Sequence, residues 1–187
     1  AIAPYFGHNY PSSEIPPATA AYPTVDEIVT TVSTDSIPIQ QDLIALQKAV
    51  ADAQGWSLIC YEGGQHFTGI FAAANDVTLT GILTNANRDP RMGTRYTEYL
   101  DMLEAAGVEM FCNFNDVNEF GRSGSWGLVE TMDQDIATAP KYLAVSDWIA
   151  QNVAPTQAFA DFLTAQGVTG PDADPAGDPD GDEVTTR

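Results

Sequence analysis

The predicted fold is decided by WSLICYEGG, residues 56–64. This is an apolar run of strand length, and two consecutive glycines close it. The sequence just before it, residues 40–55, spaces apolar side chains at helical intervals and ends in Gly55, a predicted helix stop. Those side chains are Leu43, Leu46, Val50 and Ala53. A helix that leads directly into a buried strand is half of the repeat of an α/β fold.

The same order is visible toward the N-terminus. The apolar stretch Ala1–Phe6 has the pattern of the last part of a buried strand and ends at Gly7. A loop rich in proline and serine follows, and Thr24 is the predicted N-cap of a helix that begins with VDEIV. We expect a break in the helical pattern near Ser36–Pro38, before the helix over residues 40–55.

The pattern continues toward the C-terminus. Residues 72–86 and 90–106 have helical spacing, and the second helix is closed by Gly107. Its apolar face consists of Tyr96, Tyr99, Leu100 and Leu103. The run VEMFCNFND, residues 108–116, predicts another buried strand, and after the loop NEFGRSGSWG a helix is expected over 139–152.

Three strands that alternate with helices predict parallel strands joined by right-handed crossovers, which is an α/β layer fold. Three βα units cannot close an eight-stranded barrel, and a three-stranded parallel sheet with exposed edges is a poor domain. Because the opening also has the pattern of a strand already under way, we expect the sequence to be a fragment of a longer polypeptide. The expected organisation is a partial α/β fold over 1–152, which the resemblance given below assigns to a (β/α)₈ TIM barrel, then a short helix and connector over 153–170 and an acidic segment over 171–187.

The charge of the chain excludes some partners. Its 187 residues include 26 Asp and Glu against 7 Lys and Arg, a formal net charge of −19. A nucleic-acid partner is excluded because phosphate binding needs a basic face that so few cations cannot supply. We expect no membrane span, since no apolar run approaches the roughly 18 residues that cross a bilayer.

Chemistry-bearing side chains gather where the predicted strands end. These clusters are Tyr5 with His8 and Asn9, then Tyr61 to His66, then Asn113, Asn115 and Asp116. In a (β/α)₈ barrel the catalytic residues lie at these carboxyl ends. Strand alternation places Glu62 on the same face as Leu58 and Cys60, so Glu62 projects into a pocket if that face is the barrel interior. The alternative is a solvated carboxylate before a Gly-Gly turn.

The string LICYEGGQHF resembles the seventh-strand nucleophile segment of clan A glycoside hydrolases, retaining enzymes built on (β/α)₈ barrels. AIAPYFG is similar to the sixth strand of that family, and residues 87–117 to its seventh helix and eighth strand. GSWGLVE and APKYLAVSDWI then resemble the final loop and helix. The resemblance covers about residues 1–152 and extends to a group of secreted bacterial barrel proteins. It therefore implies an extracellular or cell-surface protein that acts on a polysaccharide or oligosaccharide.

The resemblance also implies roles for individual residues. Glu62 is the candidate nucleophile, Tyr5 is expected to hydrogen-bond it, and Trp126 is expected to form the floor of a sugar subsite. Further candidates for contacts with sugar hydroxyls are His66 and Asn115. For the aromatic residues and the histidines, the alternative interpretation is ordinary packing in the core or a loop. No cofactor is expected for catalysis.

The acid/base residue of the family, a Glu after Asn at the end of the fourth strand, has no counterpart in this sequence. Asp116 is a remote alternative partner for Glu62. The missing N-terminal barrel half of the same chain is thus an expected partner, and the isolated chain is expected to be inactive. The competing hypothesis is a non-catalytic carbohydrate-binding or cell-surface barrel protein.

The acidic C-terminal segment resembles the start of the Asp-rich calcium-binding repeats of thrombospondin type 3. In PDADPAGDPDGDEV the candidate calcium ligands are Asp174, Asp178, Asp180 and Asp182, which offer the hard oxygen atoms that calcium prefers. The alternative is a disordered acidic linker. A calcium-stabilised structural module is a third interpretation of the protein.

The two cysteines, Cys60 and Cys112, fall on what are predicted to be adjacent strands. Disulfides between neighbouring parallel strands are geometrically awkward. We therefore expect two buried free thiols.

Overall fold

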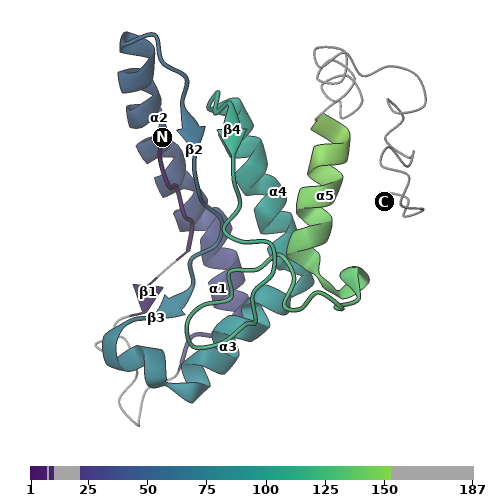
Figure 1. Ribbon diagram of the computed structural model, residues 1–187. Coiled ribbons are helices and arrows are strands. Elements are labelled where there is room, and N and C mark those ends of the chain that lie inside the picture. Colours follow the sequence, from purple (N-terminus) through teal and green to yellow (C-terminus); the bar gives the residue numbers. More distant parts are fainter. Residues whose placement is uncertain (8, 11–21, 153–187) are drawn as a thin grey trace, which may run out of the picture. The chain divides into compact units, whose positions relative to one another are not determined.

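The computed structural model describes residues 1–7, 9–10 and 22–152 (Figure 1). The chain divides into two compact units, Ala1–Ser146 and Asp147–Arg187, and every contact given below lies within the first. Its strands are β1 (Asn9–Tyr10), β2 (Ile59–Cys60), β3 (Thr68–Gly69) and β4 (Met110–Phe111). Its helical elements are α1 (Val25–Thr31), η2 (Val32–Ser36), α2 (Ile37–Ala53), η3 (Phe71–Asn75), α3 (Val77–Arg88), α4 (Pro90–Ala105), η4 (Ile136–Thr138) and α5 (Pro140–Asn152), the last of which runs into the second unit.

The strands pair in parallel, as the α/β prediction requires. Strand β2 lies beside β4 with Cys60 opposite Phe111, and Ile2 forms a parallel bridge to Cys60. Further along, Phe6 bridges Gln65 in parallel, and β1 pairs with β3. The segment around β2 therefore lies between the N-terminal segment and β4, and the mixed α/β class is confirmed.

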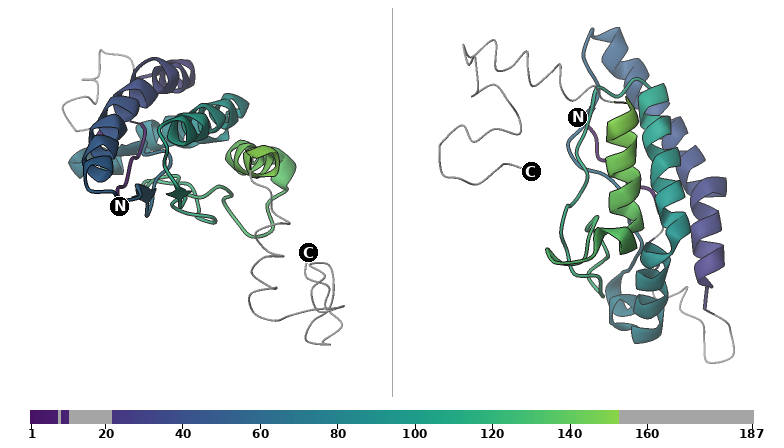
Figure 2. Two further views of the ribbon diagram at one scale, coloured as in Figure 1. Left: turned by 90° about the horizontal axis from the view of Figure 1, so that it is seen from above. Right: turned by 90° about the vertical axis from the view of Figure 1, so that its right-hand side faces the viewer.

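Helices fill both connections between these parallel segments. Elements α1, η2 and α2 follow the N-terminal segment, and α3 and α4 lie between β3 and β4. Contacts join α1 to α3 and α2 to α4. Figure 2 shows α2 and α4 side by side, on one side of the strands. The predicted helix over 90–106 corresponds to α4, and that over 72–86 is divided between η3 and α3.

The break predicted near Ser36–Pro38 was wrong. Element η2 is a π-helical segment that leads directly into α2, so the chain stays helical from Val25 to Ala53. The N–H of Ile37 donates to the carbonyl of Val32, five residues back. Pro38, which has no N–H, occupies the first turn of α2, a position where that donor is not needed. The proline is therefore absorbed by a local change in hydrogen bonding.

The apolar side chains predicted to form the buried face of α2 are mostly exposed. Leu43, Leu46 and Val50 are 49%, 66% and 61% exposed, whereas Ile44 and Ala51 are buried. The helical period was right, but the sequence carries two apolar stripes, and the structure buries the other one. The exposed stripe, which we call the α2 stripe, consists of Ile39, Leu43, Leu46 and Val50.

The core forms around α4. Tyr96, Tyr99, Leu100 and Leu103 are buried, which confirms the face predicted for this helix. The fully buried ring of Phe6 packs against Tyr96 and Tyr99, with ring centroids 5.4 and 4.8 Å apart. The hydroxyl of Tyr99 donates to the carbonyl oxygen of Pro4 at 2.7 Å. These contacts hold the N-terminal segment on the helix layer.

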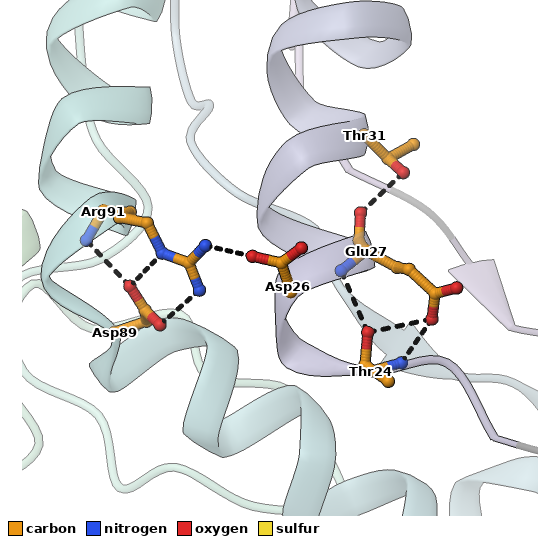
Figure 3. A network of polar contacts seen from close by, with 6 residues as sticks. All are labelled: Thr24, Asp26, Glu27, Thr31, Asp89 and Arg91. Carbon is orange, nitrogen blue, oxygen red and sulfur yellow. Dashed lines mark hydrogen bonds and ion pairs between the residues drawn. The ribbon is translucent and has the colours of Figure 1, made fainter.

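Helix α1 begins as predicted, at Thr24. Figure 3 shows the capping box: the Glu27 N–H donates to the Thr24 hydroxyl oxygen at 3.1 Å, and the Thr24 N–H donates to the Glu27 carboxylate at 2.8 Å. These hydrogen bonds from Thr24 hold the pKa of Glu27 below its usual range. Beside the cap, Arg91 pairs with both Asp26 and Asp89, which joins α1 to the N-terminus of α4.

Replacing Thr24 with alanine should lower the free energy of unfolding by about 1 kcal/mol, since it removes the side-chain acceptor of an N-cap. Chemical denaturation followed by circular dichroism measures the change. Thr30→Ala is the matched control, because Thr30 is exposed within the same helix and alanine has the higher helix propensity. Equal losses from the two substitutions would contradict the capping assignment.

Both cysteines are free, as predicted, but only one is buried. Burial raises the pKa of the Cys60 thiol to about 11, so that thiol is an inert core group. Cys112 is exposed, which corrects the expectation of two buried thiols. It follows β4, where the chain leaves the sheet, and its N–H still donates to the Cys60 carbonyl oxygen at 3.0 Å.

Candidate functional site

The turn after β2 sets the position of Glu62. Gly63 and Gly64 follow it, and Gly64 has φ +123°, a backbone conformation that side chains rarely adopt. A Cβ at Gly63 would lie 2.7 Å from Phe111 Cε2, and one at Gly64 would lie 2.9 Å from Asn113 Oδ1. Glycine is therefore required at both positions because the turn packs closely against neighbouring side chains. At Gly64 it is also required by the backbone conformation.

The predicted alternation along this strand holds only as far as Cys60. Leu58 and Cys60 are buried, and Cys60 is close enough to Tyr99 of α4 to affect its pKa, so their face meets the helix layer. Tyr61 on the opposite face is 57% exposed. Because β2 ends at Cys60, Glu62 lies in the turn, and its direction is not set by the alternation. The burial of Leu58 and Cys60 therefore does not determine where the Glu62 side chain points, and strand alternation was the wrong basis for that prediction.

Tyr5 and Glu62 are brought together, as the resemblance implies. The pKa of the Tyr5 phenol is raised to about 12, first by burial, then by the negative charge of Glu62 and by a side-chain hydrogen bond to it. The neighbouring Tyr61 raises it further. Tyr5 therefore stays protonated at physiological pH and offers Glu62 a hydrogen-bond donor.

The Tyr5 ring lies among three others, and we call the four rings the aromatic cluster: Tyr5, His66, Phe114 and Trp126. His66 and Trp126 have ring centroids 4.6 Å apart, and Tyr5 lies 5.3 Å from His66 and 6.3 Å from Trp126. Phe114 is 6.4 Å from Tyr5 and 6.2 Å from Trp126. Burial lowers the pKa of His66, so its imidazole is neutral at pH 7. The cluster joins three strand ends, and Tyr5 links it to Glu62.

Asn115 lies on the segment after β4, where its carbonyl accepts from the N–H of Leu128. Its side-chain oxygen Oδ1 is buried and has no hydrogen-bond partner within the described part of the chain. A buried acceptor without a partner is uncommon in a folded protein, but this oxygen is closed off from solvent here. Asp116 is exposed, and none of the contacts found among the described residues joins its carboxylate to Glu62.

A buried polar network beneath the Trp126 loop was not predicted from the sequence. Its members, Gln65, Asn87, Ser125 and Lys141, are each at most 1% exposed. They come from the turn after β2, helix α3, the Trp126 loop and helix α5. The one signal that could have drawn attention to Lys141 is the rarity of lysine, because the chain has only two.

The other predicted residues are not described. His8 and the calcium candidates Asp174, Asp178, Asp180 and Asp182 lie outside the described residues, and of Asn9 the structure gives only the strand pairing. Within residues 1–7, 9–10 and 22–152, no group of three His, Cys, Asp or Glu side chains is arranged to hold a metal ion. The same residues contain no helix that is both long enough and apolar enough to cross a membrane.

The site thus combines a carboxylate, a phenol that donates to it, an unpaired amide oxygen and an indole. Aromatic faces and fixed polar groups suit a polyhydroxylated ligand, which has apolar C–H faces and many hydroxyl donors. Comparison of the chain with known protein families, curated proteins and solved structures finds no match.

Proposed function

We propose that the chain is the C-terminal part of a (β/α)₈ barrel in a retaining glycoside hydrolase that acts on a polysaccharide. The observation that carries the proposal is the contact between Tyr5 and Glu62 beside Trp126. Glu62 and Tyr5 come from neighbouring parallel segments, at the ends where barrel enzymes place their catalytic groups. Extracellular or cell-surface location and calcium binding by the C-terminal aspartates belong to the same proposal and rest on the sequence.

In the proposed reaction, Glu62 attacks the anomeric carbon and forms a glycosyl-enzyme ester, while a second carboxylic acid protonates the leaving oxygen. The two carboxyl groups of a retaining enzyme lie about 5–5.5 Å apart. Tyr5 donates a hydrogen bond to Glu62, which fixes the direction of the carboxylate. Trp126 stacks on the sugar ring, and Asn115, whose Oδ1 is closed off from solvent in this structure, has to turn outward to accept from a hydroxyl. The second carboxyl belongs to the part of the barrel that precedes this chain.

Two surfaces support a further βα unit beside α2. The α2 stripe exposes Ile39, Leu43, Leu46 and Val50, a row with the spacing of a buried helix face. The N-terminal segment that α2 follows pairs on one edge with β2, and no strand pairs with its other edge among the described residues. A strand on that edge followed by a helix on the α2 stripe would cover both, which is the way a (β/α)₈ barrel continues.

A carbohydrate-binding barrel protein without activity is the second candidate. It is favoured by the aromatic cluster, in which the Trp126 ring lies beside Tyr5 and His66. Binding requires only the aromatic cluster and its polar neighbours, whereas hydrolysis also requires the acid.

The test uses the longer polypeptide that carries this chain, with a panel of soluble polysaccharides. The release of reducing ends measures hydrolysis, and the chemical shift of the Trp126 indole N–H measures binding. Hydrolysis that depends on Glu62 supports the enzyme, and binding that is lost in Trp126→Ala without hydrolysis supports the binder. Trp56→Ala is the matched control, because Trp56 is 65% exposed and makes no contact with the aromatic cluster. If the protein neither hydrolyses nor binds any polysaccharide in the panel, both candidate functions are overturned.

A further inference from the structure

The carbonyl oxygen of Ser125, one residue before Trp126, receives two short hydrogen bonds from buried side chains. Lys141 Nζ and Gln65 Nε2 each donate to it at 2.6 Å. Lys141 Nζ also donates to Asn87 Oδ1 at 3.0 Å. Asn87 in turn is fixed by its own donation to the carbonyl oxygen of Leu83 at 3.0 Å. The peptide that carries Trp126 is thus held by side chains from three separate elements.

The third contact of the Lys141 ammonium is with an aromatic ring. Its Nζ lies 4.3 Å from the centroid of Phe120, a distance at which an ammonium group is attracted to the π face. Glu130 is the carboxylate that faces it from the same side, and this group is engaged by Arg88 through two hydrogen bonds of 2.6 Å. The Arg88 guanidinium itself lies 5.8 Å from the Phe120 ring. The ammonium is therefore compensated by carbonyl oxygens and a ring, without a carboxylate of its own.

An ammonium group in such a position is costly to bury. Lys141 is 1% exposed, and burial lowers its pKa well below the ordinary lysine range. Because the desolvation cost of a buried charge can exceed the attraction that its contacts return, stability alone does not account for this lysine. What the lysine adds, and a methionine could not, is a fixed orientation of the Ser125 carbonyl.

We propose that Lys141 is a positioning residue that fixes Trp126 in the aromatic cluster beside Glu62. The chain of contacts runs from Lys141 through the Ser125 carbonyl to the indole, which lies 4.6 Å from His66. Gln65 contributes to the same positioning of Trp126, because it precedes His66 and donates to the Ser125 carbonyl oxygen. The consequence for sugar binding rests on the proposed function, whereas the effect on Trp126 does not.

The test uses a chain in which Trp126 is the sole tryptophan, made by Trp56→Phe and Trp148→Phe. Lys141→Met should raise acrylamide quenching of Trp126 and shift its emission to longer wavelength. Loss of a charged donor is expected to change the population of the ordered loop by about tenfold or more. Lys48→Met is the matched control, since Lys48 is the other lysine and lies on the surface of α2. Circular dichroism checks that each variant is folded.

A second measurement needs no substitution. With ¹⁵N-lysine labelling, the buried Lys141 ammonium should give a slowly exchanging signal and a nuclear Overhauser contact to the side-chain amide protons of Gln65, which donate to the same oxygen. The absence of that contact, or a folded Lys141→Met chain with unchanged quenching, would overturn the proposal. If the methionine variant does not fold, the labelled chain decides. Altered quenching in a protein that neither binds nor hydrolyses glycans would retain Lys141 as the positioning residue and remove the proposed function.

Discussion

Replacing Glu62 with alanine in the longer polypeptide is expected to reduce glycan hydrolysis by about 10⁴-fold or more, the range seen when a nucleophile is removed. Without the carboxylate no glycosyl-enzyme ester forms, and the rest of the site contributes only binding. The change should fall on kcat, with the affinity for the polysaccharide retained, because Trp126 and Asn115 remain in place. Initial rates of reducing-end release on a series of substrate concentrations separate the two.

Chemical rescue distinguishes a nucleophile from a residue that merely supports the site. Azide should restore turnover to Glu62→Ala and yield a glycosyl azide with inverted configuration at the anomeric carbon, since it enters from the face that Glu62 vacates. Glu109→Ala is the matched control, because Glu109 is exposed and precedes β4, at the opposite end of the neighbouring strand. Unchanged turnover in Glu62→Ala would remove Glu62 as the nucleophile.

Local signals predicted the helices better than the strands: residues 108–116, predicted to be a buried strand, form only the two-residue β4, and none of them is buried. Thr24 and Gly107 mark helix ends because capping is decided by a few adjacent residues, and the face of α4 followed from one unambiguous apolar stripe. In α2 the same reasoning failed, because Ile44 and Leu43 belong to two stripes of similar apolarity. Only the position of α4 decides between them, and that position is a tertiary property.

The residues of the candidate site also fall into two groups, those that the sequence predicted and those that it did not. Glu62 and Trp126 stood out in the sequence because each is flanked by glycines at a predicted strand end or loop. The network of Gln65, Asn87 and Lys141 did not, since its members are far apart in the sequence and each has an ordinary polar pattern locally. A buried cation is recognised only when its acceptors, which come from other elements, are known.

Replacing Gly64 with alanine should lower the free energy of unfolding by about 3–5 kcal/mol, the sum of a strained backbone and an overpacked contact. At φ +123° any side chain is strained, and the new Cβ would lie 2.9 Å from Asn113 Oδ1 and 3.0 Å from the hydroxyl of the fully buried Tyr96. The strain is not relieved by a shift of the turn, because the Gly64 carbonyl accepts from the N–H of Phe6 at 3.0 Å. Urea denaturation followed by circular dichroism measures the loss.

Gly81→Ala is the matched control for this substitution, and its expected sign is opposite. Gly81 lies within helix α3, and a Cβ there would meet nothing within 4 Å, so alanine should stabilise the chain by about 0.5–1 kcal/mol through helix propensity. The difference between the two variants isolates the turn, since both remove the same backbone freedom from the unfolded state. A Gly64→Ala chain as stable as the unmodified one would mean that the turn can take another path, and with it Glu62 another position relative to Tyr5. If the free energy of unfolding falls by the expected amount, the position of the Glu62 carboxylate depends on the packing of α4 and β4 against the Gly-Gly turn.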